Sequence, residues 1–180
     1  MPIYKTFQTE RLLLRPTSLE DALFIYELFN TPKWLQFIGE RDVKSEEAAR
    51  AYIRAKILPQ LEKLGFSNYT VIRKADNLKL GSCGLYDRPG LEGIDLGFAF
   101  LPQHEKKGYA FEASQELLRA AAEYFGLKKI IAITAGENLG SQNLLERLGL
   151  VFTKTVRLPG EEEDLLFYEK DFGMNKSSLS

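Results

Sequence analysis

The fold of this chain is decided by the stretch IDLGFAFLPQHEKKGYAFEA, residues 94–113. Its first part, Ile94–Leu101, is mostly apolar, which predicts a buried strand that ends before Pro102. From Ala110 to Phe125 the apolar residues recur at spacings of three and four, which predicts a helix. A strand therefore leads through a short basic loop into the start of a helix.

The loop between this strand and this helix has the composition of a phosphate-binding site. A helix N-terminus carries unpaired amides and a partial positive charge, and both favour a bound phosphate. Lys106 and Lys107 add charge, and Gly108 lets the backbone come close to a ligand. The same residues also fit a solvated turn at an ordinary helix start, so the spacing alone leaves both interpretations open.

Outward from this stretch, the pattern predicts a single α/β domain over residues 1–172 with a mixed sheet flanked by helices. Ser18 with Asp21 resembles a capping box, and Leu23, Tyr26 and Phe29 or their neighbours are expected to face the core. The predicted elements are, in order, a strand that Pro16 ends, a helix from Ser18 to about Phe29, a loop over 30–44, a helix from Ser45 to Leu64 that Pro59 kinks or divides, strands at Tyr69–Arg73, Leu80–Tyr86 and Ile94–Leu101, the helix at Ala110–Phe125, a strand at Ile130–Thr134, a helix from Asn138 to Gly149, and strands at Val151–Leu158 and Leu165–Asp171. Residues 173–180 are polar and are expected to form a flexible tail.

Composition excludes several classes of function. The net charge of −1 gives no basic face for nucleic acid, and the single cysteine, Cys83, forms no internal disulfide. No C-x-x-C, H-E-x-x-H, Walker or dinucleotide pattern is present, so metal and nicotinamide chemistry have no support. No apolar run approaches 18 residues, and the N-terminus lacks the apolar stretch of a signal peptide. We therefore expect a cytoplasmic protein that does not bind membranes.

Three segments together resemble the GNAT superfamily of acetyltransferases over roughly residues 7–172. Glu105, Gly108 and Ala110 take the first, fourth and sixth positions of the family's pyrophosphate loop, Gln/Arg-x-x-Gly-x-Gly/Ala. The segment Asn138–Leu150 is similar to a second family block, Asn-x-x-Ser followed by a Leu-Gly-Phe-like end. The opening Thr9–Arg15 resembles the branch that includes ribosomal-protein N-terminal acetyltransferases.

The resemblance implies a splayed central sheet, acetyl-CoA as cosubstrate and a primary amine as acceptor, with a protein N-terminus as the first candidate. It implies that the bent strand at Phe98, Ala99 and Phe100 binds the pantetheine arm. Further cosubstrate contacts are implied for Lys106, Lys107, Gly108, Tyr109, Ala110, Asn138 and Asn143. Asn138 is also a good N-cap residue, and that role alone would explain it.

The candidate catalytic residues follow from two departures from the family pattern. Glu105 replaces Gln or Arg and places a negative charge near the implied diphosphate, and Leu145 stands where many relatives carry a tyrosine that protonates the thiolate. Ser141 is therefore the candidate donor to the leaving thiolate. Asp95 is the candidate base for the amine proton, directly or through water. Asp95 also fits a structural carboxylate paired with a lysine or arginine.

Other residues and functions remain open from the sequence. Trp34 and Phe37 either line the acceptor pocket or cover the core. His104 is expected to face solvent, and Cys83 to be a small core residue. The rival functions are acetylation of a small amine (a polyamine, antibiotic or amino acid) and a sensor that binds acyl-CoA without turnover. An acidic acceptor groove would favour polyamines.

Overall fold

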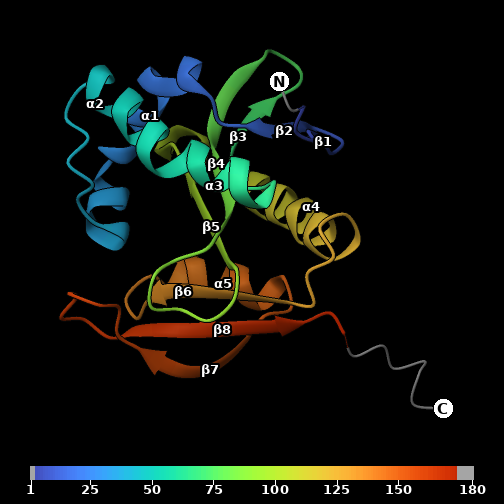
Figure 1. Cartoon of the computed structure of the whole chain (residues 1–180). Coiled ribbons are helices and arrows are strands. Elements are labelled where there is room, and N and C mark those ends of the chain that lie inside the picture. Colours follow the sequence, from blue (N-terminus) through green and yellow to red (C-terminus); the bar gives the residue numbers. More distant parts are fainter. Residues whose placement is uncertain (1–2, 174–180) are drawn as a thin grey trace.

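The computed structural model describes residues 3–173, which form one open eight-stranded mixed sheet flanked by helices (Figure 1). This confirms the α/β class predicted from the sequence. The strand order is β1-β2-β3-β4-β5-β6-β8-β7. The strands are β1 (Phe7–Gln8), β2 (Leu12–Pro16), β3 (Asn68–Arg73), β4 (Leu78–Tyr86), β5 (Asp95–Phe100), β6 (Lys129–Ala135), β7 (Val151–Val156) and β8 (Leu165–Asp171). The tail predicted from Gly173 onward lies, apart from Gly173 itself, outside the described residues.

The sheet splits between β5 and β6, which are its one parallel pair of neighbours among the described strands. Their pairing is limited to Asp95 opposite Ile131, where the Ile131 amide donates to the Ile94 carbonyl at 2.9 Å. Beyond Asp95 the two strands diverge, and Figure 1 shows β5 running away from β6 and β8. The rest of β5 pairs on its other side with β4, as in Phe98 opposite Cys83. The edge of β5 that faces β6 is therefore open for a ligand.

Helices cover the sheet through two separate apolar clusters. The first cluster joins the inner side chains of α4 (Tyr109–Glu123) and α5 (Leu139–Arg147) to the strands. The second joins α1 (Ala22–Phe29), α2 (Glu46–Tyr52) and the turn that follows α2. In Figure 1, α3 (Leu58–Leu64) passes in front of the sheet and α4 behind it. The open edge of β5 thus lies between the part of the fold that contains α1, α2 and α3 and the part that contains α4 and α5.

The half of the fold that contains α1, α2 and α3 has two π-helical turns, η2 (Trp34–Ile38) and η3 (Ile53–Ile57). Pro59 has no amide to donate, and η3 lies just before it, so the predicted helix is divided into α2, η3 and α3 as expected. The prediction of a loop over 30–44 was wrong at η2. There the Gly39 amide donates to the Trp34 carbonyl at 2.8 Å. Of the residues expected to face the core in α1, Leu23 is exposed, and its neighbours Phe24 and Ile25 are buried together with Phe29.

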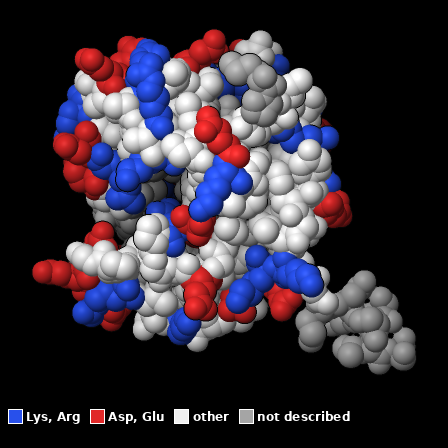
Figure 2. Space-filling model, in the orientation of Figure 1, with Lys and Arg blue, Asp and Glu red and all other residues white. Residues whose placement is uncertain are grey.

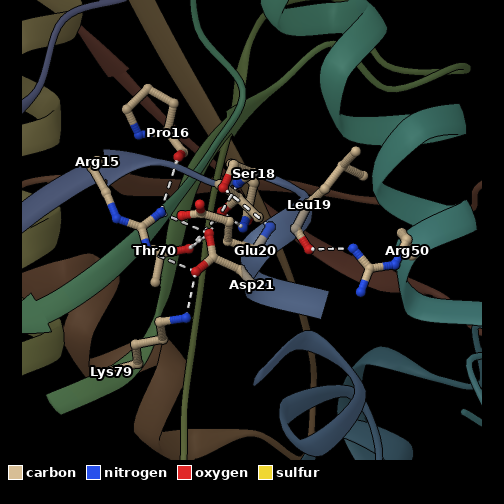
Figure 3. A network of polar contacts seen from close by, with 11 residues as sticks. Arg15, Pro16, Ser18, Leu19, Glu20, Asp21, Arg50, Thr70 and Lys79 are labelled. Atoms are coloured by element: carbon tan, nitrogen blue, oxygen red, sulfur yellow. Dashed lines mark hydrogen bonds and ion pairs between the residues drawn. The ribbon is translucent and has the colours of Figure 1, made fainter. Parts of the chain in front are cut away.

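A buried carboxylate fixes the start of α1 against the sheet (Figure 3). Asp21 accepts two hydrogen bonds of 2.7 Å from Arg15 on β2, and Lys79 on β4 lies 2.8 Å from the same carboxylate. The Ser18 amide donates to Asp21 at 2.9 Å, which completes the predicted capping box. Burial alone would raise the pKa of Asp21, but the hydrogen bonds from Arg15 and Lys79 outweigh it and lower the pKa to about 2. These contacts therefore fix the position of the start of α1 relative to β2 and β4.

Candidate active site

A cavity of about 650 Å³ occupies the splay of the sheet and is within the usual size range of ligand clefts. Its lining brings together the open strand β5, the loop before α4, the first turn of α5 and η2. Almost all of the candidate site residues lie on it, namely Trp34, Phe37, Asp95, Phe98, Ala99, Phe100, Lys106, Gly108, Tyr109, Ala110, Asn138, Ser141 and Asn143. Lys107 does not line it. Figure 2 shows a hollow on this face of the molecule with Lys and Arg side chains around it.

The loop before α4 has a backbone that only a few residue types adopt readily. Lys106 and Gly108 have φ angles of +61° and +82°, so the chain turns twice through the left-handed region before the helix begins. Gly108 stands at the N-terminus of α4, where the first amides of the helix have no partner within it. The Glu105 carboxylate, which the sequence left unexplained, is neutralised by Lys33 with Nζ and Oε2 2.6 Å apart.

Arg11 ties this loop to the N-terminal strands. Its guanidinium donates to the Lys107 carbonyl at 3.0 Å and to Glu112 Oε1 at 2.7 Å, and it stacks 4.4 Å from the centre of the Tyr109 ring. Thr9 donates to the other oxygen of Glu112. The carbonyl of Lys107 is thus turned toward Arg11. The opening segment of the chain holds the loop in shape.

The first turn of α5 presents the second group of candidates. Asn138 caps the helix, because its Oδ1 accepts from the Ser141 amide at 3.2 Å. Ser141 is half-buried on the cavity wall. Its hydroxyl forms no hydrogen bond with any of the described residues, whereas its backbone amide donates to Asn138. Leu145 is buried one turn further on and also lines the cavity. The geometry therefore places a hydroxyl at Ser141 and only an apolar side chain at Leu145.

Asp95 lies at the point where β5 and β6 part, and it is almost fully buried on the cavity wall. Its Oδ2 accepts from Arg88 Nε, so the pairing with a cation that the sequence left open is present. Its Oδ1 is buried without a hydrogen-bond partner among the described residues. Burial raises the pKa of Asp95 to about 6, although Arg88 acts in the opposite direction. The group is thus mostly ionised at pH 7 and close to its titration point.

A family model decides the identity of the chain. The model described as "Acetyltransferase (GNAT) domain" matches residues 11–151, which include the loop before α4, β5 and the whole of α5. The chain belongs to the GNAT acetyltransferases. It is therefore an acetyl-CoA-dependent N-acetyltransferase, and two curated relatives are named as uncharacterized N-acetyltransferases. The uncharacterized N-acetyltransferase YnaD of Bacillus subtilis is 28% identical over 164 residues, which cover 89% of this chain and 93% of that protein.

Solved GNAT structures share the fold of the chain at lower identity. The ribosomal-protein-S5-alanine acetyltransferase of Vibrio fischeri superposes with a TM-score of 0.76 at 19% identity, over 93% of this chain and 96% of that one. The ribosomal L7/L12 α-N-protein acetyltransferase RimL, solved in complex with coenzyme A, has a TM-score of 0.76 at 18% identity, over 94% and 99% of the two chains. These likenesses show the fold.

Within residues 3–173, no helix has both the length and the apolar character needed to cross a membrane.

Aromatic side chains form the helical wall of the GNAT cavity. Trp34 stacks on Phe29 with ring centres 3.9 Å apart, and Tyr52 meets Phe29 edge-on at 5.1 Å. All three residues line the cavity with Phe37. Trp34 also packs against the second apolar cluster, so for Trp34 the two alternatives that the sequence left open are compatible, and Phe37 is placed on the cavity.

The predicted environment is wrong for His104 and confirmed for Cys83. His104 was predicted to face solvent, which is wrong, because only 8% of it is exposed and it lines the GNAT cavity. Burial, with Arg73 and Lys107 nearby, lowers its pKa, so it stays neutral at pH 7. Cys83 is confirmed as a core residue, 3.5 Å from the Ser114 hydroxyl, and burial raises the pKa of its thiol to about 12. The thiol is therefore unreactive at neutral pH.

Sequence reasoning missed several residues that shape the cavity. Lys33 and Arg88 pair with Glu105 and Asp95, and Tyr86 beside them donates to Asn68. No local pattern marks Lys33 or Tyr86. Arg11 belongs to the opening segment that resembles one branch of the family, so the sequence did mark it. The resemblance did not indicate that Arg11 holds the loop before α4.

Proposed function

We propose that this enzyme acetylates the α-amine at the N-terminus of a peptide or protein, with acetyl-CoA bound in the splay beside β5. The observation that most supports acetyl-CoA binding is the coincidence of an open strand edge and an unpaired helix start on one cavity. The peptide acceptor is supported by the opening segment Thr9–Arg15, which resembles the ribosomal-protein branch of the family. The open edge at Phe98, Ala99 and Phe100 suits the amide-rich pantetheine arm. The α4 start at Lys106, Gly108 and Ala110, with Tyr109, suits the diphosphate. Asn138 and Asn143 complete the cosubstrate side, and Lys107 adds positive charge outside the lining.

In the proposed reaction the amine attacks the thioester carbonyl directly. A new C–N bond forms and the C–S bond breaks, so no covalent bond to the protein is needed. Amides on the free edge of β5 stabilise the negative charge that develops on the carbonyl oxygen. Asp95 accepts the proton of the attacking amine through water, and Ser141 donates a hydrogen bond to the departing thiolate. Trp34 and Phe37 form the acceptor side of the cavity.

The acceptor is tested by a screen that follows coenzyme A release. The protein is mixed with acetyl-CoA and with peptides, spermidine or an aminoglycoside, and the products are mapped by mass spectrometry. We expect acetyl groups on peptide α-amines. Products found only on polyamines or aminoglycosides would refute the peptide acceptor. A protein that binds acetyl-CoA and releases no coenzyme A with any amine would be a sensor instead.

Ser141→Ala tests the leaving-group role. The alanine keeps the backbone amide that donates to Asn138 Oδ1, so α5 remains capped. We expect kcat to fall by about 10- to 1000-fold, the range for one lost hydrogen-bond donor to a developing negative charge, because the thiolate loses its donor. The stabilisation of the protein by acetyl-CoA should stay as in the wild type and serves as the control. Wild-type turnover in this variant would remove Ser141 from the mechanism.

A further inference from the structure

The charges on the cavity wall are unbalanced. Its lining contains six lysines and arginines but three acids, which are Asp87, Asp95 and Glu105. Two of the acids are already neutralised within the protein, since Glu105 pairs with Lys33 and Asp95 with Arg88. When these two pairs are set aside, the lining contains four positively charged side chains and one negatively charged side chain, Asp87. The cavity therefore favours negatively charged ligands.

The four remaining cations divide between the two halves of the fold. Lys106 belongs to the loop before α4, and Arg147 stacks on Phe111 4.5 Å from its ring centre, so both lie on the cosubstrate side. Arg41 follows η2 and Lys56 lies in η3, so both come from the helical half that carries the aromatic wall. Neither Arg41 nor Lys56 forms an ion pair with any residue between 3 and 173. The coenzyme's charges explain the first two cations and leave these two unexplained.

A buried donor on the same wall also has no partner. The indole Nε1 of Trp34 is shielded from solvent and donates to no atom of the described chain. An unpaired buried N–H costs free energy, which an acceptor atom of a ligand would recover. Trp34, Arg41 and Lys56 are all donors, and carboxylate oxygens are acceptors only. A polyamine or aminoglycoside would instead bring further positive charge to this wall.

We infer that the acceptor amine carries a carboxylate close to the reacting nitrogen, held by Arg41, Lys56 and the Trp34 indole. The inference rests on the proposed acetyl transfer from acetyl-CoA to an amine and narrows the acceptor to amines that carry a nearby carboxylate. The amine end lies toward Asp95 and the carboxylate toward η2 and η3. The carboxylate has two sources, an acidic side chain next to a peptide N-terminus or the α-carboxylate of a free amino acid. Both present an anion to the same three donors.

Binding can be measured without turnover, because Trp34 is the only tryptophan in the chain and reports on this wall by its fluorescence. The protein is saturated with coenzyme A, so no acetyl group is present. It is then titrated with the peptide Ser-Asp-Asp-Ala-Ala, the matched peptide Ser-Asn-Asn-Ala-Ala, free aspartate and spermidine. We expect Kd for the acidic peptide or for aspartate to be about tenfold lower than for the neutral peptide, as suits hydrogen bonds to a charged group. Added salt should reduce the difference.

Arg41→Gln and Lys56→Gln should each bring the ratio of the two peptide Kd values close to one. Lys63→Gln on α3 makes the same change in net charge outside the cavity and should keep the preference. Tighter binding of the acidic peptide than of aspartate identifies the side-chain source, and the reverse identifies the free amino acid. Equal or tighter binding of the neutral peptide or spermidine, or a preference that survives in both cavity variants, overturns the inference. Selective binding without coenzyme A release in an acetyl-CoA assay supports the inference and contradicts the proposed transfer to peptides.

Discussion

Gly108→Trp is expected to abolish the stabilisation of this protein by acetyl-CoA. A ligand at a hundredfold excess over Kd stabilises the folded state by about 2.7 kcal/mol. For a domain of this size that corresponds to a rise in Tm of roughly 5–10 °C. Gly108 lines the cavity at the start of α4, and a side chain there would begin 3.2 Å from Arg11 Nη2, so an indole would displace the loop proposed to hold the diphosphate. A thermal melt with and without millimolar acetyl-CoA measures the shift.

Gly126→Trp is the matched control for this variant. Gly126 follows the other end of α4 and has a similar left-handed backbone, with φ of +68° against +82° for Gly108. A Cβ atom at Gly126 would have no neighbour within 4 Å, and at Gly108 it would meet Arg11 Nη2 at 3.2 Å. Both variants therefore bear the same kind of backbone strain, but only Gly108→Trp should lose the acetyl-CoA shift. A full shift in Gly108→Trp would move the diphosphate site elsewhere.

Asp95→Asn is expected to lower kcat by about 100- to 10,000-fold near neutral pH, the range for a lost general base. Asparagine has nearly the same shape and can still accept from Arg88, so the buried contact persists without a proton acceptor. The pKa of Asp95 is raised to about 6, so the wild-type kcat should rise as the pH increases through 6 and then level off. In the variant that step should vanish, and activity should recover partly at high pH where more acceptor is free amine.

Glu92→Gln is the control for the loss of a nearby carboxylate, because Glu92 is exposed on the loop before β5 and lies outside the cavity lining. It should keep the wild-type pH–rate profile. If Asp95→Asn also keeps that profile, Asp95 serves only as the partner of Arg88.

Strong local patterns made most of the fold predictable. The apolar spacing of α4 and the Ser18–Asp21 capping box were sufficient to place α4 and the start of the first helical segment. The two-residue strand β1 was missed because it is defined only by pairing with β2. The turn η2 was taken for a loop because proline and glycine flank it and its π-helical bonds have no sequence signal. Weak local preference and strong tertiary context explain both errors.

The candidate site was less predictable than the fold because its electrostatics depend on distant residues. Lys33 and Glu105 are 72 positions apart in sequence, and no pattern connects them. His104 was placed in solvent because a polar loop residue usually is, but the packing of the loop buries it. Asp95 was found because it lies on the strand that resembles the family's central strand. Its raised pKa follows from burial, which a single sequence does not show.

The two π-helical turns lie on the side of the cavity that is proposed to bind the acceptor, whereas the residues proposed to bind acetyl-CoA lie on or beside β5, α4 and α5. Each closes its hydrogen bonds over five residues instead of the four of an α-helix, so each holds one residue more per turn. We expect removal of one residue from η2 or η3 to rotate the side chains of the aromatic wall and to leave β5, α4 and α5 in place. Small changes in length on the helical side are therefore the expected route to new acceptor preferences. Libraries that vary the length of residues 34–38 and 53–57 are the natural starting point for redirecting this enzyme to other amines.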